Sequence, residues 1–152
     1  MPEQPTEKNI VVNRKARHEF TILQTFEAGI VLQGTEVKSL RQGKINLADS
    51  YAQVVNGEVW LVNSHINVYD HGNINNHDPL RKRKLLVNKS EIRRLVKATQ
   101  EKGNTLVPLR FYFKGGIVKV EIAIAKGKKV YDKREDIAKK DAARELERKV
   151  KY

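Results

Sequence analysis

Three short segments of this chain place lysine and arginine beside side chains that stack or form hydrogen bonds. They are residues 13–20 (NRKARHEF), 81–84 (RKRK) and 126–134 (KGKKVYDKR). The cations attract phosphate oxygens, while His18, Phe20 and Tyr131 could stack on unpaired bases. A single basic run is as often a solvated face as it is a binding site. Three such runs in a chain of 152 residues favour a nucleic acid as the ligand.

The chain has 30 basic and 18 acidic residues, a net charge of +12, which favours polyanionic partners without specifying a fold. An anionic membrane surface would require an amphipathic helix with large apolar side chains on one face, but the only tryptophan, Trp60, lies in a strand-like run. No apolar stretch approaches the roughly 20 residues of a membrane span, and the N-terminus lacks the apolar core of a signal peptide. We therefore expect a cytoplasmic protein that binds RNA, with neither a membrane nor DNA as a partner.

Histidines and aspartates between residues 65 and 78 are the place where a metal site is conceivable. His71 and His77 have Asp70 and Asp78 beside them, with His65 upstream, and imidazole and carboxylate both ligate divalent cations. The glycine, asparagine and proline content of this stretch is, however, typical of a surface loop. We expect turn-forming and solvated side chains there, and no metal.

A nuclease would need two titratable groups held within reach of a phosphate. His18 with Glu19 or His65 supplies the residue types, but the spacing does not support such a pair. The chain has no cysteine, which excludes disulfides, thiolate catalysis and Cys-based zinc sites, and no glycine-rich phosphate loop follows a predicted strand. We expect a protein without enzymatic activity or cofactor; an RNA-processing enzyme is the competing function of a different class.

Two β-hairpins are predicted. Residues 52–55 and 58–62 flank Asn56-Gly57, a pair that tolerates the positive φ angles of a type I′ turn. Residues 106–113 and 117–125 flank Lys114-Gly115-Gly116, and in the second of these strands alternate aliphatic residues share one face. These non-local strands predict a barrel or a sandwich.

One amphipathic helix is predicted between the hairpins. Ile92, Leu95, Val96 and Thr99 recur at helical spacing, after Asn88 or Ser90 as N-cap and before Gly103 as a stop. A shorter helical turn is expected at residues 38–42, ended by Gly43. Upstream, strand-like runs include Phe20 and Ile22 and, after a break, Ile30, Leu32 and Val37.

Both ends of the chain differ in composition from the middle. Residues 1–9 are polar and contain two prolines, so they predict a disordered leader. From Lys126 to the end, eleven basic residues stand against six acidic ones, with few aliphatics. Ordering such a segment costs about 1–2 kcal/mol per residue, which its apolar burial cannot offset. We expect a folded domain at residues 10–125 and a tail at 126–152 that becomes helical only when bound.

The chain resembles a known family, the SsrA-binding proteins (small protein B), which are bacterial partners of transfer-messenger RNA. The segments that carry the resemblance are NRKARHEF (13–20), FEAGIVLQGTEVKSLRQGK (26–44), DSYAQV (49–54), NHDPLRKRKLL (76–86), TLVPLRFYF (105–113) and VKVEIAIAKGKKVYDKRED (118–136). The resemblance implies a closed six-stranded antiparallel barrel related to the oligonucleotide-binding fold, with short flanking helices.

The resemblance also implies a function. The barrel would bind the tRNA-like domain of transfer-messenger RNA, and the tail would enter the empty mRNA channel and decoding centre of the small subunit in a stalled ribosome, for trans-translation. Elongation factor Tu is a further candidate partner in the delivery complex. A ribosomal or initiation-type RNA-binding protein with a similar barrel is the alternative of the same class.

The RNA-binding residues expected from the basic clusters and the resemblance fall into two groups. In the domain they are Arg14, Lys15, Arg17, His18, Phe20, Glu27, Arg81, Arg83 and Asn88. In the tail they are Lys126, Lys128, Lys129, Tyr131, Asp132, Lys133 and Arg134. Phe20 stands where relatives often have tyrosine, so its contact would lack a hydroxyl. Glu27, in an expected Glu-Ala-Gly turn, has the alternative role of orienting a basic loop.

Overall fold

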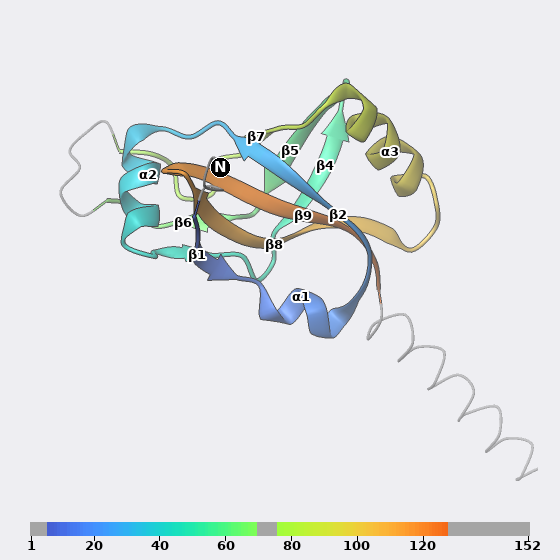
Figure 1. Cartoon of the computed structure of the whole chain (residues 1–152), viewed down its shortest axis with the longest axis horizontal. Helices are drawn as coiled ribbons and strands as arrows, with labels where there is room; N and C mark the ends of the chain where they lie inside the picture. Colours follow the sequence, from blue (N-terminus) through green and yellow to red (C-terminus); the bar gives the residue numbers. More distant parts are fainter. Residues whose placement is uncertain (1–5, 70–75, 128–152) are drawn as a thin grey trace, which may run out of the picture.

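The computed structural model describes residues 6–69 and 76–127, which form a mainly β structure with a few helices (Figure 1). The strands are β1 (Glu7–Val12), β2 (Phe20–Ile30), β3 (Ile45–Asn46), β4 (Tyr51–Val55), β5 (Glu58–Val62), β6 (His65–Ile66), β7 (Arg83–Leu86), β8 (Asn104–Lys114) and β9 (Ile117–Gly127). The helices are α1 (Arg14–Glu19), α2 (Gly34–Arg41) and α3 (Lys89–Thr99). No helix in this described part is long and apolar enough to span a membrane.

Six of the strands are joined in a ring. Their order is β8-β4-β5-β7-β2-β9, with β9 pairing back to β8, and all pairings are antiparallel. The shortest pairing in the ring is the one between β4 and β8, in which Ala52 lies opposite Leu106. Beyond that point β1 pairs with residues 110–114 of β8. The expected mainly β fold with short helices is therefore confirmed.

Both predicted hairpins are present. Asn56 and Gly57, between β4 and β5, have φ angles of 52° and 74°, the positive values that a type I′ turn requires. Gly115 and Gly116 have φ angles of 57° and 80°, and Lys114 belongs to β8, so this turn has two residues. Glycine is favoured here because it adopts these angles without the clash of a Cβ atom.

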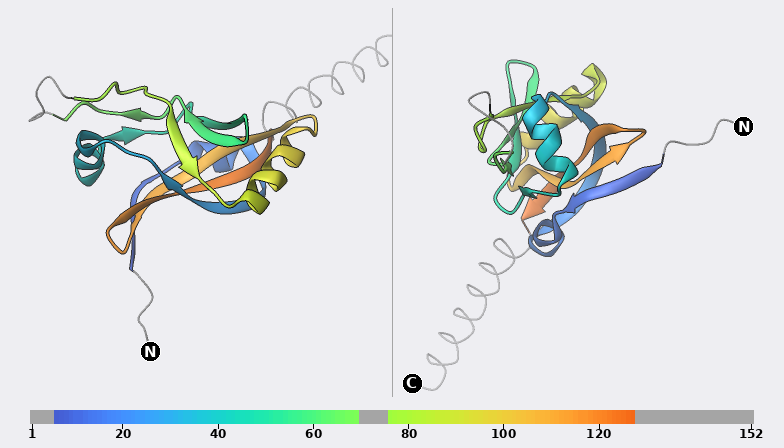
Figure 2. Two further views of the ribbon diagram at one scale, coloured as in Figure 1. Left: turned by 90° about the horizontal axis from the view of Figure 1, so that it is seen from above. Right: turned by 90° about the vertical axis from the view of Figure 1, so that its left-hand side faces the viewer.

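The main core fills the inside of the ring. Alternate residues of β9 point into it, as predicted: Val118, Val120, Ile122 and Ile124 are buried. Helices α2 and α3 add Leu40 and Leu95 to the same core and lie at opposite ends of the molecule (Figures 1 and 2). A second, smaller cluster lies outside the ring, where Ala16 of α1 covers residues of β8 and β9.

Helix α3 agrees with the prediction, and α2 is longer than predicted. Asn88 is the N-cap of α3, and Gly103 lies beyond its end with a φ angle of 87°. Helix α2 begins at Gly34, not at residue 38, and a positive φ of 69° at Gly43 follows its end. Val37 therefore lies in a helix, and its assignment to a strand-like run was wrong.

Three further differences concern the first 30 residues. Strand β1 includes residues 7–9, which were assigned to the leader, because pairing with β8 orders them despite their polar sequence. Strand β2 runs without the expected break, with only an irregularity between Ile22 and Gln24; at that point the exposed run of Leu23, Gln24 and Thr25 interrupts the alternation. The sequence pattern did not predict helix α1, because six residues with one buried side chain, Ala16, show no periodicity.

A buried carboxylate, Glu36 of α2, organises one end of the ring. Its Oε1 accepts hydrogen bonds from the Gln33 backbone N–H at 2.7 Å and from Arg81 at 2.6 Å. Its Oε2 accepts from Nε of Arg83, which is also fully buried. The same guanidinium donates to the Ser64 carbonyl at 2.7 Å and hydroxyl at 3.0 Å. This network ties α2 to β7 and to the segment that precedes it.

His77, expected to be solvated in a surface loop, is buried in the same region. Its Nε2 lies 2.9 Å from the Ile66 carbonyl and its Nδ1 lies 2.9 Å from the Thr35 hydroxyl. A carbonyl can only accept, so Nε2 carries a hydrogen and the ring bridges β6 to α2. The loop expectation was wrong at His77, because tertiary packing encloses a histidine that lies in a polar stretch of the sequence.

The pKa of Glu36 is lower than the ordinary value. Burial favours the neutral acid, but the hydrogen bonds from Arg81, from the Gln33 backbone and from Arg83, together with the charge of Arg83, outweigh burial. A depressed pKa in the folded state stabilises the protein above the ordinary pKa of 4.5. That stabilisation is lost as the pH falls through the folded pKa.

We predict that Glu36→Gln lowers the free energy of unfolding at pH 7 by roughly 3–5 kcal/mol, because Arg83 then stays buried without a counter-charge. Urea denaturation measures the change. The control is Glu58→Gln, which removes an exposed pair with Lys84 at 3.4 Å and should cost less than about 1 kcal/mol. The difference between wild type and Glu36→Gln should also narrow below pH 4.5. Equal losses of unfolding free energy in the two variants would show that the buried network does not stabilise the fold.

Candidate nucleic-acid interface

The outward face of β2, β9 and β8 carries polar side chains in register. Arg110 lies opposite Glu121, and Tyr112 lies opposite Lys119, across the β8–β9 pair. On the other edge of β9, Glu27 of β2 lies opposite Glu121. Because side chains alternate along a strand, these residues all lie on the outside of the ring while their neighbours line the core.

Helix α1 is joined to this face by an ion pair between Arg17 and Glu121. Arg17 places Nη2 3.7 Å from one oxygen of Glu121, and Arg110 places Nε 3.3 Å from the other. Arg110 also reaches β1, donating to Asn9 at 2.8 Å and to Glu7 at 3.1 Å. The basic helix and the polar sheet face therefore form one continuous surface.

Glu27 of β2 lies on the same surface, opposite Glu121 of β9. The guanidinium of Arg110 stacks 3.9 Å above the Tyr112 ring, and the Tyr112 hydroxyl donates a hydrogen bond to Glu27. Lys114 places Nζ 3.1 Å from the same carboxylate. Glu27 is in β2 and not in the expected turn, and its partner Lys114 is the last residue of β8. Its alternative role of orienting a basic loop stays a prediction.

The hydrogen bond from Tyr112 is the main reason that the pKa of Glu27 is lower than usual, and Lys114 and Lys119 add to the effect. Burial and the adjacent carboxylate in turn raise the pKa of the Tyr112 phenol. At neutral pH the phenol is therefore a donor and Glu27 is an anion. The structure therefore fixes an acceptor close to Lys114 and Lys119.

A buried cap positions the cations of α1. The Asn13 side chain accepts from the Ala16 backbone N–H at 3.3 Å and donates to the Pro108 carbonyl at 2.9 Å. With Ala16 turned into the small cluster, the basic side chains of the helix are left outside. The exposed residues are Arg14, Lys15, Arg17 and His18. Four of the five predicted residues of the first basic segment are thus accessible together.

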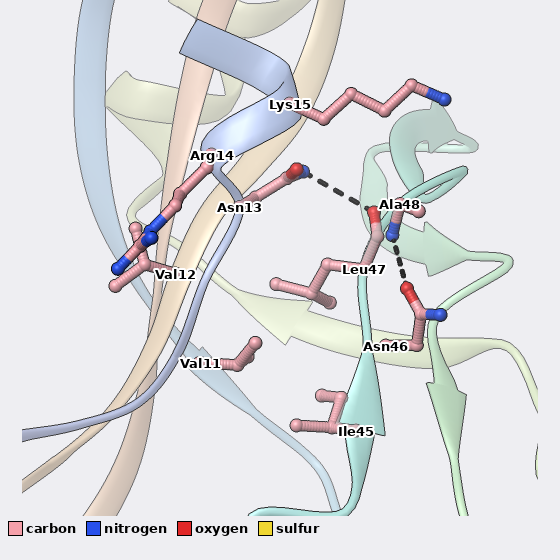
Figure 3. Close-up of a pocket in the computed structure, with 9 residues that line it drawn as sticks. All are labelled: Val11, Val12, Asn13, Arg14, Lys15, Ile45, Asn46, Leu47 and Ala48. Atoms are coloured by element: carbon pink, nitrogen blue, oxygen red, sulfur yellow. Dashed lines mark hydrogen bonds between the residues drawn. The ribbon is translucent and has the colours of Figure 1, made fainter.

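A groove of about 210 Å³ lies where β1 passes into α1. Figure 3 shows Val11 and Ile45 on facing walls, with Lys15 extending over Ala48 and Arg14 pointing the other way beside Val12. Lys15 is only loosely held, with Glu19 at 3.8 Å and Asp49 at 3.7 Å. Lys15 can therefore turn toward a phosphate near the groove.

Leu86, where β7 pairs with β2, is a candidate interface residue that was not predicted from the sequence. Leu86 lies opposite Gly29 and is 52% exposed. A Cβ atom on Gly29 would be 3.3 Å from the Leu86 Cβ, so glycine lets the leucine lie close against β2. Asn88, exposed at the N-cap of α3, follows two residues later and makes no side-chain capping bond. The signal in the sequence was a leucine at an outward-facing position of a strand.

Two of the predicted arginines are structural. Arg83 is fully buried and bound to Glu36 and Ser64, so its prediction as an RNA-binding residue is wrong: the local run RKRK does not reveal that β7 turns it inward. Arg81 is partly exposed but also bonds to Glu36 and to the Val31 carbonyl. Phe20 is half-buried and packs against the cluster under α1.

The tail predictions lie almost entirely outside the described residues. Lys126 belongs to β9, where it is exposed, so β9 continues two residues past the expected domain end. Lys128, Lys129, Tyr131, Asp132, Lys133 and Arg134 lie outside the described part. Within residues 6–69 and 76–127 no three potential metal ligands come together; Asp70 and His71 fall outside these ranges.

Comparison with known proteins identifies the family. Residues 10–152 match the family model described as SmpB protein. The chain belongs to the SmpB family. The SsrA-binding protein of Desulforudis audaxviator is 63% identical over 142 residues, which cover 93% of both chains. That of Acetivibrio thermocellus is 62% identical over 146 residues, covering 95% of both.

A solved structure of the SmpB family is also similar. It is described as "tmRNA-SmpB: a journey to the center of the bacterial ribosome" and has a chain that is 51% identical to this one, with a TM-score of 0.67. The match covers 78% of this chain and 83% of the other. Together with the curated relatives, it shows that the likeness extends over the fold and beyond the isolated motifs.

We predict that Tyr112→Phe raises the pKa of Glu27 toward its ordinary value of 4.5, because the largest cause of the depression is removed. A carbon-13 NMR titration of the Glu27 carboxyl measures it. Tyr51→Phe, at an exposed tyrosine of β4, is the control and should leave the Glu27 titration unchanged. An unchanged pKa in Tyr112→Phe would show that Tyr112 does not control the charge of Glu27.

Proposed function

We propose that this protein is an RNA-binding translation factor that binds the tRNA-like domain of transfer-messenger RNA and delivers it to stalled ribosomes for trans-translation. The observation that carries the proposal is the 63% identity to an SsrA-binding protein over 93% of both chains. The similar solved chain described with transfer-messenger RNA and the ribosome supports the same partners. Elongation factor Tu is a further proposed partner in the delivery complex, and we propose a cytoplasmic location.

The continuous outer surface suits an RNA with exposed loops. Arg14, Lys15 and Arg17 supply phosphate contacts that position the RNA without reading sequence. Glu27 requires a different partner, because a fixed carboxylate repels phosphate. It would accept hydrogen bonds from base amino or imino groups or from a ribose 2′-hydroxyl. Leu86 offers an apolar surface at the same edge.

We further propose that the ring of strands is a closed barrel related to the oligonucleotide-binding fold. The closed cycle of antiparallel pairings and the core inside it support this architecture, which is frequently used for RNA. The tail from residue 128 onward is proposed to occupy the empty mRNA channel of the small subunit, with Tyr131 and the adjacent basic residues as contacts. Its composition supports ordering on contact with RNA. No catalytic step is part of the proposal.

RNA that co-purifies with the protein tests the proposed function. We predict that affinity purification from a bacterial lysate recovers a single abundant stable RNA with a tRNA-like end, identified by sequencing. Its binding should weaken steeply with salt, because neutralised phosphates release condensed counterions. Recovery of ribosomal RNA alone would favour the ribosomal or initiation-type alternative. Turnover of labelled RNA would favour an RNA-processing enzyme.

Truncation after Gly127 should separate RNA binding from ribosome function. The shortened protein keeps the outer surface, so its affinity for the tRNA-like RNA should fall only modestly, through weaker long-range attraction. It should fail to support peptide tagging in a reconstituted translation system. Full-length Glu27→Ala is the complementary variant and should lose RNA affinity while its tail is intact. Tagging by the truncated protein would overturn the proposed division.

A further inference from the structure

Helix α3 has a basic outer face, separate from the basic side chains of α1. With 3.6 residues per turn, Leu95 points into the core, where it is fully buried. The opposite side carries Lys89, Arg93 and Lys97, spaced by four residues and all exposed. These three residues are called the α3 stripe. At 1.5 Å per residue, its charges recur about every 6 Å along the helix.

The α3 stripe is not neutralised by the part of the fold that the structure describes. Among the described residues, none of its three members forms an ion pair, and neither does the adjacent Arg94. Glu91, the one acidic residue of α3, lies on the partly buried side. Like charges four residues apart destabilise a helix, so the stripe costs stability and makes no compensating ion pair in the described fold. This favours an external anion.

The α3 stripe continues the proposed RNA interface. It begins at Lys89, directly after the N-cap Asn88 and three residues after the exposed Leu86. From there α3 extends along its own end of the molecule, away from α2 (Figures 1 and 2). An RNA bound at Glu27, Leu86 and Asn88 is therefore next to the first charge of the stripe.

We propose that the α3 stripe binds phosphate groups of the same RNA that is held at Glu27, Leu86 and Asn88. This inference rests on the proposed function and adds a contact to it. Lysine and arginine without aromatic or acceptor groups beside them bind backbone phosphates and read no sequence. A membrane does not fit the stripe, because membrane-surface helices insert a wide apolar face. On α3 that face is in the core, and Val96, 36% exposed, is the aliphatic residue left on the outer side.

The triple variant Lys89→Gln, Arg93→Gln and Lys97→Gln tests the proposal. Glutamine keeps good helix propensity, and thermal melts check the fold. The control triple variant is Lys8→Gln, Lys38→Gln and Arg41→Gln, which removes two lysines and one arginine from exposed positions of β1 and α2. Both variants have the same net charge, so any difference between them reports local contact and not long-range attraction.

Affinity for a transcript of the tRNA-like domain is measured over a series of salt concentrations. Removal of one phosphate contact should reduce the slope of log affinity against log salt by about one. The α3 variant should therefore lose about three from the slope, and the control should lose less than about one. Equal slopes in the two variants would overturn the proposal. A reduced affinity for vacant ribosomes alone would also overturn it, because another RNA would then be the ligand.

A separate measurement tests the proposed function itself. If the wild type shows no preference for the tRNA-like domain over an unrelated structured RNA, the proposed function fails. The slopes of the two variants on the unrelated RNA still show whether the α3 stripe contacts phosphates. The contact and the identity of the RNA are thus judged by separate measurements.

Directed cleavage provides a second test that does not depend on affinity. The chain has no cysteine, so Ser90→Cys offers a single attachment point for an iron-based cleavage reagent on the exposed side of α3, without altering the stripe. Cleavage of the bound tRNA-like domain is expected from this position. Gln42→Cys, exposed at the end of α2, should give little or none. Absence of cuts from position 90 would overturn the proposal.

Discussion

The register of β9 between β2 and β8 is the constraint on which the rest of the structure depends. Strand β9 pairs along its length with both neighbours, and its connection to β8 is a two-residue turn at Gly115-Gly116. Because side chains alternate, this register sends Val120 and Ile122 into the core and leaves Glu121 outside, between Arg17 and Arg110. A slip of one residue would exchange these faces. The same backbone pairing thus sets both the core and the candidate interface.

Buried charge decides which basic residues remain accessible to RNA. Glu36 binds Arg83 in the interior and Arg81 at its edge, because a buried carboxylate is tolerated only when it is paired and hydrogen-bonded. The outer cations have looser partners: Lys15 lies 3.7 Å from Asp49 and 3.8 Å from Glu19, and exposed pairs of this kind contribute little stability. Such cations can exchange a carboxylate for a phosphate at small cost.

The candidate interface combines rigid and adjustable parts. Glu27 is held by Tyr112, which is covered by the Arg110 guanidinium, so an acceptor has a fixed position on the rigid sheet. The lysines and arginines around it have long side chains that can follow an RNA backbone. A fixed acceptor discriminates among donors on bases and ribose, while mobile cations supply attraction that does not depend on sequence. Under the proposed function, specificity and affinity therefore come from different residues of one surface.

Local sequence was enough to predict both hairpins, helix α3 and the class of ligand. Turn chemistry at Asn56-Gly57 and at Gly115-Gly116 indicated both hairpins, helical spacing around Leu95 indicated α3, and the charge of +12 indicated a polyanion. Which charges face solvent, in contrast, depends on the tertiary fold. Nothing in the run RKRK separates the buried Arg83 from its neighbours, because its partner Glu36 is 47 residues away. Nor does the sequence reveal that Tyr112 holds Glu27 across 85 residues. Side-chain type and spacing encode local periodicity, whereas burial and pairing arise only when distant strands come into register.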